Sequence, residues 1–166
     1  VFLNIYMKDF IEATNSYGPY ITSTSTPLEV GKGFEIWSTL GNPTVSYTGG
    51  SLNSGDISPM VYATDADLSG TIDGGTEGYN LIGNPYPSAI DLGTENDPVA
   101  GYTWDRLDPT MYAWNGSGWS SFNMAGDGAG VNGGTRYVAS MQGFFVHAND
   151  FYPALTANFK IEPNEI

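Results

Sequence analysis

The chain has 166 residues, which is enough for one domain with a hydrophobic core. It carries 18 acidic and 5 basic side chains, for a formal net charge of −13. Five scattered bases cannot form the positive patch that binding to nucleic acid or to an anionic membrane requires. The charge is compatible with metal cations and with neutral polar ligands such as sugars. The absence of cysteine excludes disulfides and thiol chemistry.

An aromatic fraction of 14%, with 22 glycines and 10 prolines, is typical of a turn-rich all-β protein. The turn signals predict strands near residues 1–11, 19–23, 33–38, 44–48, 60–63, 79–83, 111–115, 119–122, 136–139, 143–148 and 155–161. Asn115-Gly116 predicts a hairpin turn, and residues 126–134, rich in glycine, predict a mobile loop. We therefore expect a single domain over 1–166, an antiparallel β-sandwich of jelly-roll-like form.

An internal repeat predicts that the sandwich is built from two related halves. The segment 30–38 resembles the segment 141–149, and their Gly-Phe pairs lie 110 residues apart (144 − 34). The halves would be about 1–57 and 103–166, joined by 58–102. Phe34 and Phe144 would then occupy matching core positions. Chance similarity between glycine-rich strands is the alternative interpretation.

Residues 65–77 (DADLSGTIDGGTE) have the spacing of a calcium loop. Calcium prefers six to eight oxygen ligands, and alternate residues can supply them if the chain curls around the ion at a glycine such as Gly70. The candidate ligands are Asp65, Asp67, Ser69, the carbonyl of Thr71, Asp73 and Glu77.

The match to a helix–loop–helix calcium site is incomplete. The twelfth loop position ordinarily holds a bidentate Glu, but here it holds Thr76, and Glu77 comes one residue later. The flanking segments are strand-like rather than helical. We therefore expect a calcium loop between strands, with a solvated acidic turn as the alternative.

No motif in the chain predicts catalysis. His147 is the only histidine, and no nucleophile-elbow motif accompanies it. One histidine without cysteine does not make the usual zinc sites. The carboxylates Asp105 and Asp108, or Glu95 and Asp97, could form a glycosidase pair, but no surrounding motif supports one. We expect the protein not to be an enzyme.

The aromatic residues between 102 and 119 are the candidates for ligand binding. Tyr and Trp rings stack on sugar rings while their polar atoms form hydrogen bonds. Tyr102, Trp104 and Trp119 would form a carbohydrate platform if they share an exposed face. Alternatively, Trp114 and Trp119 are cross-strand partners in the core, with at least two of the four tryptophans buried.

Three segments carry a resemblance to a known family: 78–91 (GYNLIGNPYPSAID), 31–34 (GKGF) and 141–146 (MQGFFV). Over about 28–150 the chain resembles a β-rich extracellular module of large surface and secreted proteins of Bacteroidetes, which the type IX secretion system exports. The resemblance implies a cell-surface or extracellular location and neighbouring domains in a larger parent chain. It implies no enzymatic activity. Compared with that pattern, we expect this segment to begin partway into the first repeat and to lack the sorting domain.

Together these features predict a non-catalytic, calcium-stabilised extracellular module that binds a polysaccharide or cell-surface glycan, or mediates adhesion. A purely structural spacer of a giant surface protein is the first alternative, and a fragment of a polysaccharide-degrading enzyme is the second. No apolar segment approaches transmembrane length, so we expect no membrane insertion. The strand-like start, without a signal peptide, predicts a processed piece of a longer protein.

Overall fold

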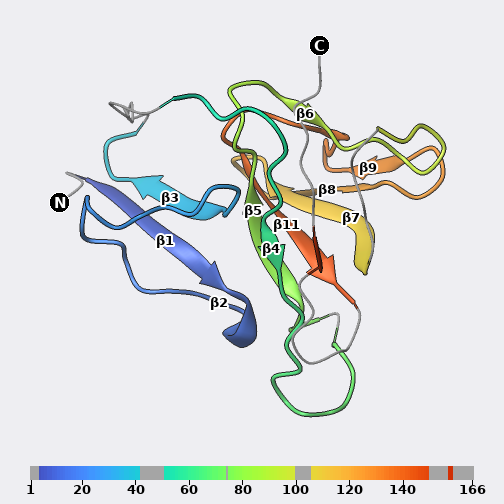
Figure 1. Ribbon diagram of the computed structural model, residues 1–166, viewed down its shortest axis with the longest axis horizontal. Helices are drawn as coiled ribbons and strands as arrows, with labels where there is room; N and C mark the ends of the chain where they lie inside the picture. Colours follow the sequence, from blue (N-terminus) through green and yellow to red (C-terminus); the bar gives the residue numbers. More distant parts are fainter. Residues whose placement is uncertain (1–3, 42–50, 74, 100–105, 150–156, 159–166) are drawn as a thin grey trace.

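The computed structural model of the protein describes residues 4–41, 51–73, 75–99 and 106–149, together with the backbone of 157–158. Over these residues the chain is all-β, with one short 3-10 turn, and every strand pair is antiparallel. The sheets are arranged as in a sandwich (Figure 1), so the predicted fold class is confirmed.

The elements in chain order are β1 (Ile5–Ile11), η1 (Glu12–Thr14), β2 (Ser16–Tyr17), β3 (Phe34–Ser38), β4 (Met60–Val61), β5 (Tyr79–Gly83), β6 (Ile90–Asp91), β7 (Leu107–Trp114), β8 (Trp119–Asn123), β9 (Ala129–Val131), β10 (Tyr137–Val138), β11 (Gly143–Ala148) and β12 (Ala157–Asn158). The largest sheet has the order β5-β11-β7-β8-β9. A three-stranded sheet has the order β2-β1-β3, and two ribbons pair β10 with β6 and β12 with β4.

One face of the five-stranded sheet carries the hydrophobic core. Alternate residues of a strand share a face, so Phe144 of β11 lies beside its cross-strand partner Ile82 of β5. Val146 of β11 lies on the same face and pairs with Met111 of β7, which pairs with Phe122 of β8, and all of these side chains are buried. Side chains from the two ribbons, including Ile90 of β6, cover this face.

The segment after β5 closes the core through a buried polar side chain. The Asn84 amide nitrogen donates to the carbonyls of Val138 and Ala139 at 3.2 and 3.0 Å, and its Oδ1 accepts from the Tyr86 backbone at 3.0 Å. Asn84 and Tyr86 are both fully buried. These contacts tie β5 to the segment around β10.

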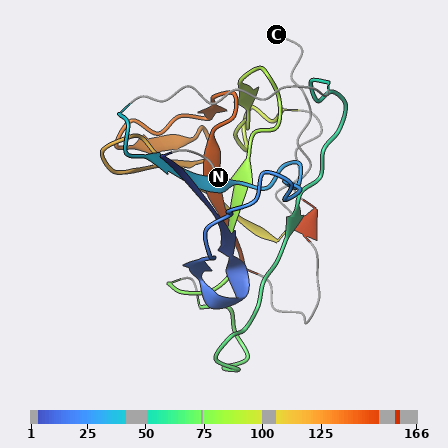
Figure 2. The ribbon, with the colours of Figure 1, turned by 90° about the vertical axis from the view of Figure 1, so that its left-hand side faces the viewer.

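The small sheet lies beside the five-stranded sheet, on the left in Figure 1 and in front in Figure 2. Tyr6 of β1 pairs with Trp37 of β3, and Lys8 pairs with Glu35, so these four side chains share one face. Phe10, also on this face, meets Phe145 of β11 edge-to-face at 4.9 Å between ring centroids. The shared face of the small sheet is therefore turned toward the side of the large sheet opposite the core.

Residues 31–33, which we call the hook, connect the two sheets through backbone contacts with β5. Lys32 forms a bridge with Ile82, and the Gly33 amide donates to the Leu81 carbonyl at 2.9 Å. A Cβ on Gly33 would lie 2.6 Å from Leu81 Cγ and 2.7 Å from the Ile82 carbonyl oxygen. Only glycine permits this approach without a shift of the backbone.

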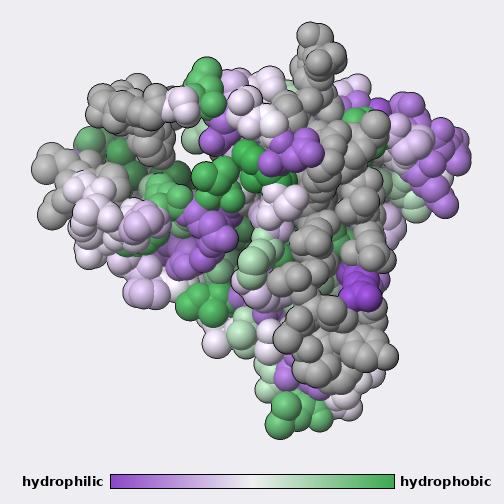
Figure 3. Space-filling view, viewed as in Figure 1, coloured by the Kyte–Doolittle hydropathy of each residue, from purple (hydrophilic) through white to green (hydrophobic). Residues whose placement is uncertain are grey.

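The expected matching core positions of Phe34 and Phe144 are not found. Phe144 is fully buried in the core, whereas Phe34 is only half-buried and lies outside the core cluster. The reason is that β11 is an interior strand of the large sheet, while β3 belongs to the small sheet. The corresponding face of β3 is left partly open, and Ile36 on it is exposed. Figure 3 shows apolar surface around a hollow beside β3.

Two local expectations differ from the structure. Residues 19–23 are not a strand, although the Ile21 amide donates to the Met7 carbonyl at 2.9 Å. Part of the glycine-rich segment 126–134 is not a mobile loop, because Ala129–Val131 pairs with β8 as the edge strand β9. The predicted strand 44–48 lies outside the described residues. The hairpin at Asn115 is confirmed, with its amide donating to the Gly118 carbonyl at 3.0 Å.

Candidate functional site

The loop that precedes β5 curls around the carboxylate of Asp65. The Asp65 oxygens accept from the backbone amides of Ser69 at 3.0 Å and Gly70 at 2.7 Å. Asp67 also accepts from the Ser69 amide, at 2.9 Å. Gly70 has a φ of +89°, a left-handed conformation that glycine adopts readily. The sequence spacing thus produces the tight turn that was expected at this glycine.

Glu77 closes the other end of the loop from a buried position. Its side chain is 4% exposed. One carboxylate oxygen accepts from the amides of Ala66 and Asp67 at 2.7 and 3.2 Å, and the other accepts from the Asp73 amide at 3.0 Å. These bonds satisfy a carboxylate that would otherwise be costly to bury.

Three carboxylates converge in this loop. Asp65, Asp67 and Glu77 each offer an oxygen, and these three oxygens lie within 4.8 Å of one another. Hydrogen bonds from the Ser69 backbone amide, and then from its hydroxyl, hold the pKa of Asp67 below its usual value. The group therefore stays ionised and presents oxygen ligands of the kind that a hard divalent cation prefers.

The other predicted ligands occupy different places in the loop. The Ser69 hydroxyl donates to the Thr71 carbonyl at 3.1 Å, so these two oxygens stand side by side. The Asp73 carboxylate is not part of the converging group. Instead, the Asp73 carbonyl accepts from the amides of Thr76 and Glu77, both at 2.9 Å. This turn brings Glu77 inward, although the sequence places it one position after the usual ligand.

The tryptophans that the structure describes are exposed. Trp37, Trp114 and Trp119 have exposed fractions of 45, 54 and 48%. Trp114 and Trp119 are cross-strand partners, with ring centroids 5.6 Å apart. They stand on the face opposite the core, so the expectation that at least two of the four tryptophans lie in the core is wrong. The two other platform residues expected beside Trp119, Tyr102 and Trp104, lie outside the described residues.

A cleft of about 530 Å³ lies between this face and β3. Trp114 and Trp119 form one wall, Trp37 forms the other, and Phe145 lines the cleft between them. Gln142 and Glu35 contribute polar atoms. Sequence reasoning missed Trp37, because only the register of β3 against β1 and the hook at Gly33 bring it to this place.

Ring contacts hold both walls of the cleft. Trp119 meets Phe145 at 5.6 Å between ring centroids, and Phe145 meets Phe10 at 4.9 Å. On the opposite wall the Trp37 ring is stacked on Tyr6, with centroids 4.5 Å apart and an interplanar angle of 15°. Such contacts limit the freedom of the rings before any ligand binds, which lowers the entropy cost of stacking.

His147 is bound within the protein and lies outside the cleft lining described above. It is buried in β11, and its Nδ1 lies 2.6 Å from an Asp108 oxygen. The other Asp108 oxygen accepts from the side-chain amide of Asn149 at 2.5 Å, and the Tyr79 and His147 ring centroids lie 4.8 Å apart. Asp108, one of the carboxylates considered for hydrolysis, thus serves to hold β11 against β7.

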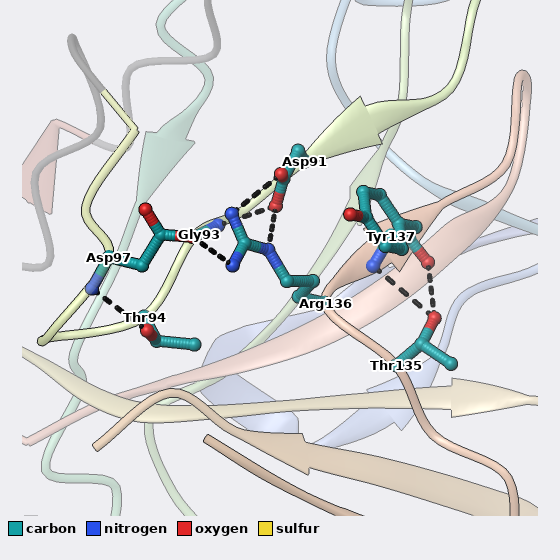
Figure 4. A network of polar contacts seen from close by, with 7 residues as sticks. All are labelled: Asp91, Gly93, Thr94, Asp97, Thr135, Arg136 and Tyr137. Atoms are coloured by element: carbon teal, nitrogen blue, oxygen red, sulfur yellow. Dashed lines mark hydrogen bonds and ion pairs between the residues drawn. The ribbon is translucent and has the colours of Figure 1, made fainter. Parts of the chain in front are cut away.

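The other candidate carboxylates also hold loops in place. Arg136 binds Asp91 through two nitrogens, at 2.5 and 2.7 Å, and binds Asp97 at 2.6 Å (Figure 4). Burial raises the pKa of Asp91, but the Arg136 hydrogen bonds outweigh burial and hold that pKa below its usual value. Glu95 accepts from the Gly126 amide at 2.8 Å. Asp105 lies outside the described residues.

Comparison of the chain with protein-family models, with curated proteins and with solved structures finds no match. Over the described ranges, the structure contains no helix that is long and apolar enough to cross a membrane. The geometry of the acidic loop and of the aromatic cleft therefore carries the functional argument.

Proposed function

We propose that the protein is a non-catalytic carbohydrate-binding module stabilised by calcium. One observation carries the binding proposal: three exposed tryptophans, from three different strands and two different sheets, line the same cleft. Exposed aromatic rings that converge in this way supply stacking surfaces for the apolar faces of sugar rings.

The polar atoms and the charge of the chain favour neutral or basic glycans. Gln142 and Glu35 stand at the cleft and provide hydrogen-bonding partners for sugar hydroxyls. A net charge of −13 repels anionic glycans at long range. We expect weak affinity, because a face of stacked sugars gives few fully desolvated contacts.

The lining of the cleft favours binding over hydrolysis. Glycoside hydrolysis ordinarily uses two carboxyl groups on either side of the scissile bond. Among the described residues that line the cleft, Glu35 is the only one with a carboxylate. We therefore propose that a bound glycan is held without being cleaved.

Calcium, in this proposal, binds in the loop before β5. Asp65, Asp67 and Glu77 are the primary ligands because their oxygens converge, and Ser69 and the Thr71 carbonyl complete the oxygen set. A bound ion would relieve the repulsion among three carboxylates and stabilise the native state by linkage. The melting midpoint should rise when calcium replaces EDTA, and an unchanged midpoint would contradict the site.

The cellular location of the module and its neighbouring domains are proposed from sequence resemblance. The segments 78–91 and 141–146 resemble extracellular modules of large surface proteins, which supports a surface or secreted location beside other domains. Adhesion to a glycan-coated surface would follow from the same cleft. A spacer role remains the alternative, and it makes a different prediction for the cleft tryptophans.

The deciding experiment combines Trp119→Ala with a matched exposed aromatic, Tyr137→Ala. Tyr137 is 59% exposed on β10 and does not line the cleft. Affinity electrophoresis in neutral polysaccharides should show binding by the wild type and by Tyr137→Ala, and loss of binding by Trp119→Ala at a nearly unchanged melting temperature. Absence of binding by the wild type, or equal effects of the two substitutions, would favour the spacer.

A further inference from the structure

Glu35 is a carboxylate without a charged partner in the described part of the chain. It is half-buried on β3, on the same face as Trp37, and it lines the cleft. No ion pair within 4.0 Å is found between Glu35 and a described lysine or arginine. Partial burial destabilises an ionised carboxylate, and a cation beside it offsets that cost.

The lysine that lies opposite Glu35 on the neighbouring strand makes a different contact. Lys8 lies directly opposite Glu35 on β1. Its ammonium group lies over the Tyr20 ring, 4.5 Å from the ring centroid. This face of the small sheet thus already holds one ammonium group by cation–π attraction, and it leaves the Glu35 carboxylate available.

Aromatic residues line the cleft together with this carboxylate. The Tyr17 phenol lines the same cleft, and its pKa is raised by burial and then by the negative charge of Glu35, which places the carboxylate near that ring. Trp37 and Trp119, from the two walls, are further aromatic residues in the cleft lining. Several aromatic faces beside one carboxylate are the surroundings in which proteins bind organic ammonium groups.

We propose that the cleft selects glycans that contain amino sugars with a free, protonated amine. The inference rests on the proposed carbohydrate function and deepens it. Sugar rings stack on the tryptophans, while the ammonium group of one unit lies between the Glu35 carboxylate and the neighbouring rings. The net charge of −13 attracts such cationic glycans at long range, but Glu35 supplies the local selectivity.

The experiment compares two hexasaccharides with the same β-linked backbone. One is the glucosamine hexamer, below the pKa of its amines, and the other is its N-acetylated, neutral counterpart. Isothermal titration of the wild type should give about tenfold tighter binding of the amine form, the gain expected from one cation–π contact and one partly exposed ion pair. Glu35→Gln should reduce this preference to about threefold, because only the cation–π contribution remains.

A matched control separates local from long-range attraction. Glu29→Gln removes the same charge from an exposed position outside this cleft, and it should leave the tenfold preference unchanged. Equal effects of Glu29→Gln and Glu35→Gln would overturn the proposal, because net charge alone would then explain the preference. An oligolysine hexamer that binds as tightly as the amine form would also overturn it, since a basic peptide would then be an equivalent ligand.

The failure of this inference is distinguishable from the failure of the proposed function. If the wild type binds both hexasaccharides equally, the glycan function stands and the amino-sugar selectivity is wrong. If neither hexasaccharide nor any neutral polysaccharide binds, both proposals fail. The melting temperature of Glu35→Gln, which replaces a half-buried carboxylate by its isostere, verifies that each comparison is made on folded protein.

Discussion

Glu77→Gln tests the part of the acidic loop that carries both stability and the proposed ion. In the wild type, one Glu77 oxygen accepts from the amides of Ala66 and Asp67, and the other accepts from the amide of Asp73. Gln retains one oxygen acceptor and replaces the second by an NH₂ donor. The most favourable orientation keeps the oxygen toward the two amides, so that the Asp73 amide faces a donor.

The expected loss of stability in EDTA follows from the one hydrogen bond that the Asp73 amide loses. A buried amide left without an acceptor costs about 1 to 3 kcal/mol. For a domain of this size, 1 kcal/mol lowers the melting temperature by about 2 to 4 °C. A central value of about 2 kcal/mol thus predicts that Glu77→Gln melts about 4 to 8 °C below the wild type in EDTA.

Calcium should widen this gap. The wild type is expected to gain stability from the ion by linkage, and the variant should gain less because a ligand charge is gone. Circular-dichroism melts of both proteins, in EDTA and in excess calcium, measure the two effects separately. Glu95→Gln is the control, since Glu95 is exposed and also accepts one backbone amide, and it should change stability by less than about 0.5 kcal/mol.

Two results would refute the reasoning, each in a different part. An unchanged melting temperature of Glu77→Gln in EDTA would show that the lost hydrogen bond costs no more than is regained by relieving the repulsion among the three carboxylates. An equal rise of the midpoint with calcium in Glu77→Gln and in the wild type would show that Glu77 is not a ligand.

Two further predictions concern the core and the acid stability of the domain. Phe144→Ala should cost about 3 to 5 kcal/mol by urea denaturation, whereas Phe34→Ala should cost less than half as much, because Phe34 is only half-buried; equal losses would contradict the placement of Phe34. The lowered pKa of Asp91 contributes stability that is present above the ordinary pKa of Asp and is lost as the pH falls toward the folded value. Arg136→Met should therefore lower stability at neutral pH and weaken its fall in acid; a melting temperature that falls with acid as steeply as in the wild type would contradict this assignment.

The acidic loop (residues 65–77) could be predicted from the sequence because its ligands lie close together in the chain. Asp65, Asp67 and Gly70 lie within six residues, and the spacing of carboxylates around a glycine constrains where their oxygens can point. The sequence could not show that Glu77 rather than Asp73 joins the carboxylates. That choice depends on the turn closed by the Asp73 carbonyl, which is a property of the folded backbone.

The aromatic cleft, lined by Trp37, Trp114 and Trp119, could be predicted from the sequence only in part. The hairpin at Asn115 predicted that Trp114 and Trp119 are neighbours, but not which face of the sheet they occupy. A strand in an antiparallel sheet buries one face, and a shift of one residue exchanges the faces. Trp37 joins them from a strand 77 residues earlier in the chain (114 − 37), and no local pattern encodes that approach.

The hook at Gly33 sets the width of the cleft independently of the core. A methyl group there would collide with the backbone of Ile82, so β3 would have to move outward. Trp37 would then retreat from Trp119, while the buried row through Phe144 lies on the other face of the large sheet and keeps its packing. One backbone contact thus sets the separation of the two walls of the cleft, and a substitution at this residue would change the width of the cleft without rebuilding the core.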